Sequence, residues 1–215
     1  MSLSRRWFAP ATGLAFPALL VAWLLIIARK EPIDSAVPQD IVSFYNQNNA
    51  RVMIGWTLLA LAGVAFLFFA GTLWRVLRSA EGSTGWLSTV MFGGGIVAAG
   101  GMLLMAGLAM VLGYITGSDL EDVLDPVGFQ AIHVLALELT LPAAYGMAAF
   151  LLAGGLLVIR TRVLPGWLGW VALVLAVIDV VPALQVGLFA SSLWVFAASI
   201  VLMRGMRPVV TAGAT

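Results

Sequence analysis

The chain has 215 residues, of which 62% are hydrophobic and only 10% are charged, and its formal net charge is +1. Soluble domains are about 25% charged, so this composition excludes a water-covered surface and predicts an all-α integral membrane protein whose first partner is the lipid bilayer. The absence of cysteine excludes disulfides and thiolate metal sites, and the small net charge argues against nucleic acid as a partner, because no basic face is present to neutralise phosphates.

Six apolar stretches are long enough to cross a bilayer, which takes about 20 residues of helix. They predict one transmembrane domain built as a six-helix bundle. The last two stretches are short and closely connected, so a re-entrant pair is the alternative for them. The predicted spans are approximately 11–28, 52–77, 86–114, 129–159, 167–182 and 187–203.

The Lys and Arg residues predict the orientation of this bundle, because basic residues near helix ends stay in the cytoplasm. With both termini placed in the cytoplasm, only Arg29, Lys30 and Arg51 of the 11 basic residues lie outside. The acids separate in the opposite way, and Glu81 is the single acid of an inner connection. We therefore expect a multi-pass membrane protein with both termini in the cytoplasm.

The first outer connection, residues 29–51, contains a possible short amphipathic helix. Ile41, Phe44 and Tyr45 have helical spacing on one face, which is typical of a helix lying on a membrane surface. We expect this helix to be a packed lid, and ligand recognition is the alternative.

The third stretch is rich in glycine. Small residues allow helices to approach closely in lipid, so the glycines place this helix at the centre of the bundle, with a flexible gate as the alternative. The glycines concerned are Gly93, Gly94, Gly95, Gly100, Gly101 and Gly107.

Three ionisable residues lie within the fourth and fifth stretches, where a charge is costly and usually faces the protein interior. With three polar neighbours they form a candidate polar pocket open to the outside. We expect these residues to hold the bundle together by interhelical hydrogen bonds, and a functional site is the alternative. The six candidates are His133, Glu138, Asp179, Gln130, Tyr145 and Gln185.

Helical geometry limits how these side chains pair, because each residue turns by about 100°. Glu138 and Tyr145 share a face, whereas His133 and Glu138 point about 140° apart and cannot form a direct acid–base pair on one helix. A partner of His133 is therefore expected from another helix or from the acidic outer loop. Pro142 has no N–H to bond the carbonyl of Glu138 and predicts a freed carbonyl at this point.

The single histidine also limits cofactors. Bis-His haem ligation and three-His zinc sites each need more than one histidine. We expect no cofactor and no metal, and the sequence identifies no catalytic residue.

Two short segments carry a resemblance to known proteins. The first contains Phe44 and Tyr45 with Asn49 and Arg51, and the second has Arg160 followed by the run Leu-Pro-Gly-Trp-Leu-Gly-Trp at 164–170. Over about residues 40–204 the chain resembles a broad group of bacterial multi-pass membrane proteins, common in high-GC Gram-positive bacteria and placed in a domain family of unknown function. The resemblance implies a six-helix bundle in the plasma membrane and no transferable catalytic residue.

Three functional hypotheses follow. The first is a non-enzymatic membrane protein that is structural, accessory or ligand-sensing, with a membrane-protein partner or a second copy of itself. The alternative is a small-solute or ion-coupled transporter with an outward-facing polar pocket. The second alternative is an intramembrane lipid-modifying enzyme with His133 as acid or base.

Overall fold

The computed structural model describes residues 3–28, 37–82, 85–118, 124–181 and 187–205, and this part of the chain contains helices and no strands. The all-α class predicted from composition is therefore confirmed, and all six apolar stretches are helical. The elements are α1 (Leu3–Trp23), the π-helical turn η1 (Leu24–Ala28), α2 (Pro38–Glu81), α3 (Trp86–Thr116), α4 (Pro126–Glu138), α5 (Thr140–Thr161), α6 (Gly166–Val180) and α7 (Gly187–Gly205).

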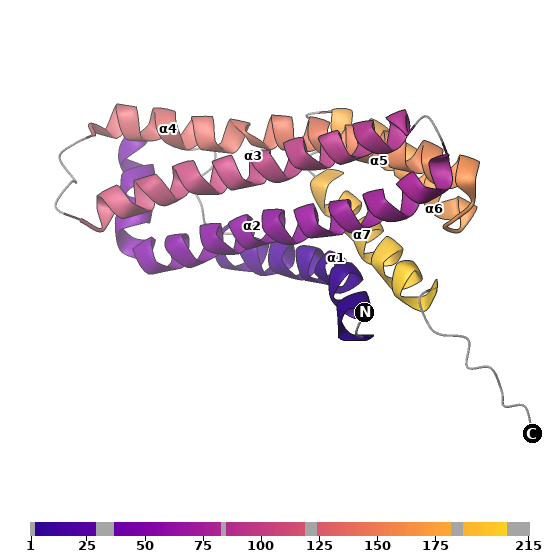
Figure 1. Cartoon of the computed structure of the whole chain (residues 1–215). Coiled ribbons are helices and arrows are strands. Elements are labelled where there is room, and N and C mark those ends of the chain that lie inside the picture. Colours follow the sequence, from indigo (N-terminus) through magenta and orange to yellow (C-terminus); the bar gives the residue numbers. More distant parts are fainter. Residues whose placement is uncertain (1–2, 29–36, 83–84, 119–123, 182–186, 206–215) are drawn as a thin grey trace, which may run out of the picture.

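The helices pack as a closed ring around an apolar core (Figure 1). α3 packs between α2 and α5, and α4 contacts both α3 and α2. The contact with α2 includes Tyr45 in its first part, and we call this end of the bundle the outer end after its predicted orientation. α6 packs on α5, α1 packs on α2, and α7 contacts both α1 and α6. Because α7 contacts both α1 and α6, it completes the ring.

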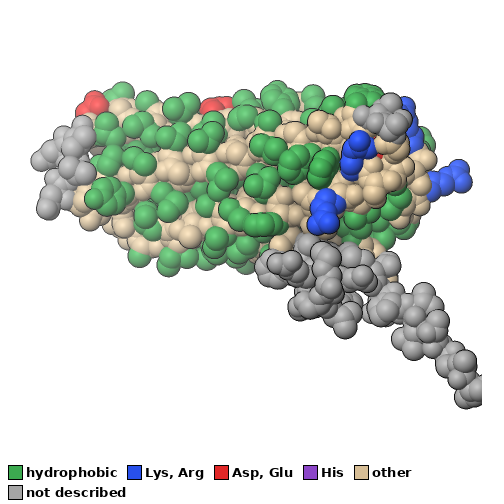
Figure 2. Space-filling model, viewed as in Figure 1, with side chains coloured by type: hydrophobic (Ala, Val, Ile, Leu, Met, Phe, Trp, Pro, Cys, Tyr) green, Lys and Arg blue, Asp and Glu red, His purple; other side chains and the backbone are tan. Residues whose placement is uncertain are grey.

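The outer surface of this ring is suited to hydrocarbon rather than water. Large apolar side chains cover its sides, and in the view of Figure 2 the Lys and Arg side chains gather at one end. Four helices are long and apolar enough to cross a membrane, with α4 and α5 counted as one. These four are Pro38–Glu81, Trp86–Thr116, Pro126–Thr161 and Gly187–Arg204, and the shorter apolar helices are Ala11–Ile27 and Gly166–Val180.

α2 is longer than the predicted second span because it includes the amphipathic helix of the first outer connection. Asn48 has non-helical angles (φ −123°, ψ 22°), and at this kink the first part of α2 turns across the end of the bundle (Figure 1). Ile41 and Tyr45 are buried beneath it, whereas Ser43 is exposed. This part of the first outer connection is thus helical, and it buries Ile41 and Tyr45.

The predicted fourth span, 129–159, is two helices rather than one. α4 ends at Glu138 and α5 begins at Thr140, and Pro142 lacks the N–H that would bond the Glu138 carbonyl. The Thr140 hydroxyl donates a hydrogen bond to the carbonyl of Leu137 at 2.6 Å. The break follows from the donor that Pro142 lacks.

The connection between α2 and α3, an inner one in the predicted orientation, is closed by its single acid. Glu81 accepts hydrogen bonds from the backbone N–H groups of Leu87 (2.9 Å) and Ser88 (3.0 Å), so its carboxylate caps the start of α3. Burial alone would raise the pKa of Glu81, but these hydrogen bonds, the Ser88 hydroxyl and the charge of Arg78 together lower it below 4.5.

Candidate functional site

The five candidate residues that the structure describes do not gather in one pocket. Glu138 and Tyr145 are exposed on the outside of the bundle, and 48% of the Tyr145 side chain is accessible. They share a face as predicted, but it is the face turned away from the core. Gln130 is partly buried on α4, and Gln185 lies outside the described residues.

His133 is buried at the outer end of the bundle, where it contacts α2. Its Nδ1 lies 3.2 Å from the hydroxyl of Tyr45, and the two rings meet edge to face with centroids 5.7 Å apart. Phe129, one turn before His133, also meets the Tyr45 ring edge to face, with centroids 5.2 Å apart. The partner of His133 thus comes from another helix, as predicted, and the histidine is turned away from the exposed Glu138.

Two further side chains of α2 bind neighbouring helices close to Tyr45. The Asn49 amide donates hydrogen bonds to the Gly113 carbonyl and to the Thr116 hydroxyl (3.1 Å), both in the last turn of α3. The Arg51 guanidinium donates to the Ile26 carbonyl in η1. The carbonyl groups in the last turn of a helix lack intrahelical partners, and Arg51 donates to one of them, that of Ile26 near the end of η1.

Tyr45, Asn49 and Arg51 therefore connect α2 to α4, α3 and η1, and we call these three residues the outer clamp. Sequence reasoning did not assign them a role as a group. The available signal was that these three polar side chains lie at spacings of four and two along one helix.

Asp179 is buried in the last turn of α6, and 4% of it is exposed. Its Oδ2 accepts a hydrogen bond of 2.7 Å from the hydroxyl of Ser191 on α7. Ser191 lies in the first turns of α7 and was not predicted as a site residue. Asp179 thus joins α6 to α7, whereas His133 joins α4 to α2. The two residues bond different partners.

A cavity of about 420 Å³ opens at the outer end between α2, α3 and α4. Its polar wall includes Asn46, Thr116 and Asp125, and the Asp125 carboxylate also accepts a hydrogen bond from the Gly128 N–H at the start of α4. None of the five described candidate residues lines this cavity. The other lining residues are Val42, Ile115, Leu124, Pro126 and Phe129.

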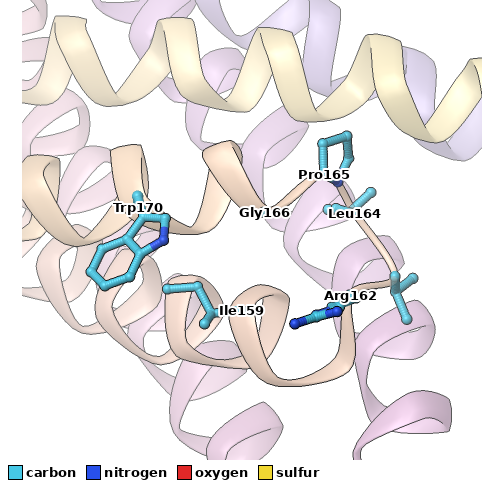
Figure 3. Close-up of a pocket in the computed structure, with 7 residues that line it drawn as sticks. Ile159, Arg162, Leu164, Pro165, Gly166 and Trp170 are labelled. Atoms are coloured by element: carbon cyan, nitrogen blue, oxygen red, sulfur yellow. The ribbon is translucent and has the colours of Figure 1, made fainter.

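A second cavity, of about 390 Å³, lies at the opposite end, at the turn between α5 and α6. Figure 3 shows Arg162 and Trp170 lying along this turn, with Ile159 between them. Trp170 is largely exposed. Exposed tryptophan beside arginine at a helix end is typical of the headgroup layer of a membrane.

Within the described ranges, no three His, Asp or Glu side chains lie close enough together to hold a metal ion. The chain matches no family model, no curated protein and no solved structure.

Proposed function

We propose that the chain is a non-enzymatic, multi-pass protein of a bacterial plasma membrane, acting as a structural, accessory or ligand-sensing component. The observation that carries this proposal is the use of the intramembrane polar side chains. The outer clamp binds three neighbouring elements, and Asp179 is bonded to Ser191 across a helix pair. In lipid such hydrogen bonds hold helices together.

The proposal includes six spans with both termini in the cytoplasm. Five arginines lie at the carboxyl ends of three helices. They are Arg75 and Arg78 in α2, Arg160 and Arg162 at the end of α5, and Arg204 in α7. Their common end supports a cytoplasmic location under the positive-inside rule.

The burial of His133 favours this proposal over a lipid-modifying enzyme. A lipid substrate would have to reach the imidazole, which is 1% exposed and packs against the Tyr45 ring. A general acid or base must come within about 3 Å of the proton that it transfers. The closed packing supports a structural role for this histidine.

The experiment that tests the proposal is reconstitution of the purified full-length protein in liposomes. We expect no solute-dependent or pH-dependent flux above that of empty liposomes. Flux that is present in the wild type and lost in Asp179→Asn would replace the proposal with an ion-coupled transporter. Exposed Glu138→Gln is the matched control, because it removes a carboxylate that contacts none of the interhelical hydrogen bonds above.

A further inference from the structure

We propose that Asp179 and Ser191 form a buried binding site for one small monovalent cation, taken up as a proton or as an alkali ion such as Na⁺. The two side chains face each other between the end of α6 and the start of α7. The inference concerns binding alone and does not depend on whether the protein transports anything.

The carboxyl group of Asp179 has one oxygen in use and one unused. Oδ2 accepts the hydrogen bond from Ser191, whereas Oδ1 is buried and has no hydrogen-bond partner within the described part of the chain. An unpaired polar atom in a dry interior is costly. Oδ1 therefore offers a position that a bound cation would satisfy.

No opposite charge in the neighbouring helices compensates Asp179. α6 packs against α5 and α7. Within the described parts of these helices the ionisable groups are the exposed Tyr145, Arg160 and Arg204. Both arginines lie at the end of the bundle opposite to Asp179, in the last turns of α5 and α7. A buried carboxylate without a counter-charge is strongly unfavourable, so binding of one positive charge stabilises the folded protein.

The surrounding backbone is suited to a cation as well. The last carbonyl groups of a helix lack intrahelical partners and carry partial negative charge, and Asp179 is placed one residue before the end of α6. Gly187 begins α7 beside Oδ1, where the Cβ of any larger residue would collide with this oxygen.

The charge of the site selects a monovalent ion. Asp179 is its one acidic side chain among the described residues, and the Ser191 hydroxyl is neutral. A single carboxylate balances one positive charge, whereas divalent ions are ordinarily held by several carboxylates.

The test is thermal unfolding of the full-length protein in detergent, followed by tryptophan fluorescence. One arm varies pH from about 5 to about 8 in choline buffers free of alkali ions, and the other adds Na⁺ at constant pH and ionic strength. We expect the unfolding temperature of the wild type to rise by about 5 °C on acidification, on addition of Na⁺, or on both. Asp179→Asn, which is already neutral, should lose this gain, and Glu138→Gln should keep it.

The two arms distinguish the source of the charge. A gain on acidification alone assigns a proton, and a gain with Na⁺ assigns an alkali ion. Ser191→Ala is the second variant, because it keeps the carboxyl group and removes one ligand. Ser191→Ala should weaken Na⁺ binding about tenfold, or shift the pH at which half of the stabilisation is reached by about one unit. Equal responses of the wild type, Asp179→Asn and Ser191→Ala in both arms would overturn the proposal.

Discussion

Single side chains at the outer end connect helices that are distant in the sequence. Tyr45 is fully buried and reaches His133 on α4, which is itself 1% exposed. A polar pair of this kind stabilises the fold mainly because losing one member leaves the other buried with fewer partners. The contribution of the Tyr45 hydroxyl can therefore be measured directly.

Tyr45→Phe removes this hydroxyl and leaves the ring packing on Phe129 in place. We expect the free energy of unfolding to fall by about 1 kcal/mol, the usual scale for a hydrogen bond between membrane helices. The matched control is Tyr145→Phe. Because Tyr145 is exposed, loss of its hydroxyl should change the free energy of unfolding by less than about 0.5 kcal/mol. Equal effects of the two substitutions, measured by denaturant titration in mixed micelles, would argue against the Tyr45–His133 bond.

Glu81 makes the stability of the connection between α2 and α3 depend on pH. Its pKa is lowered in the folded state, so its contribution to stability is present above 4.5 and is lost as pH falls through the lowered value. Wild type should therefore exceed Glu81→Gln in unfolding temperature at neutral pH, and the difference should vanish on acidification. A difference that persists unchanged in acid would show that the carboxylate does not cap α3.

At the scale of elements, α3 and α5 approach so closely that only glycine fits at their contact. A Cβ on Gly94 would lie 2.6 Å from the backbone N of Phe150, and one on Gly101 would lie 2.8 Å from the backbone N of Ala143. Gly93, Gly100 and Gly107 have open space instead. The glycine-rich sequence therefore has one face that packs and one that does not.

Neighbouring glycines of α3 provide a matched test of this contact. Gly101→Ala places a methyl group against the backbone of α5 and should cost about 1–3 kcal/mol of stability. Gly100→Ala should be neutral or stabilise by up to about 1 kcal/mol, because alanine is the better helix former and meets no neighbour. Thermal unfolding of both variants measures the difference, and a loss in Gly100→Ala equal to that in Gly101→Ala would refute the packing assignment.

For the whole molecule, the ring of helices has two chemically different ends. The outer clamp and the lid formed by the first part of α2 close one end, and the arginine-bearing turns occupy the other. The proposed orientation therefore assigns Ser43 and Ser79, both exposed, to opposite sides of the membrane.

The absence of cysteine makes this orientation simple to test with single-cysteine variants. Ser43→Cys should react with a membrane-impermeant maleimide on intact cells, whereas Ser79→Cys should react only after the membrane is permeabilised. The reverse pattern would invert the topology, and labelling of both positions on intact cells would contradict the number of spans between them.

The sequence predicted the helices well because an apolar stretch in lipid has little alternative to a helix. It also predicted relative directions within a helix, including the opposed His133 and Glu138. It could not predict that Glu138 faces outward and Asp179 inward, because both faces of a helix in lipid are apolar and hydropathy does not mark the core side. Pro142 was the one feature of the sequence that indicated the break at Leu139.

The outer clamp also implies an order of assembly as the chain emerges from the ribosome. The partner of Arg51 lies 25 residues before it, whereas the partners of Asn49 and Tyr45 lie 64 and 88 residues away and are made later. Domains fold from the N-terminus during synthesis, so the nascent protein fastens α2 to η1 first, to α3 next and to α4 last. Truncated nascent chains that stop before His133 should therefore remain open at the outer end.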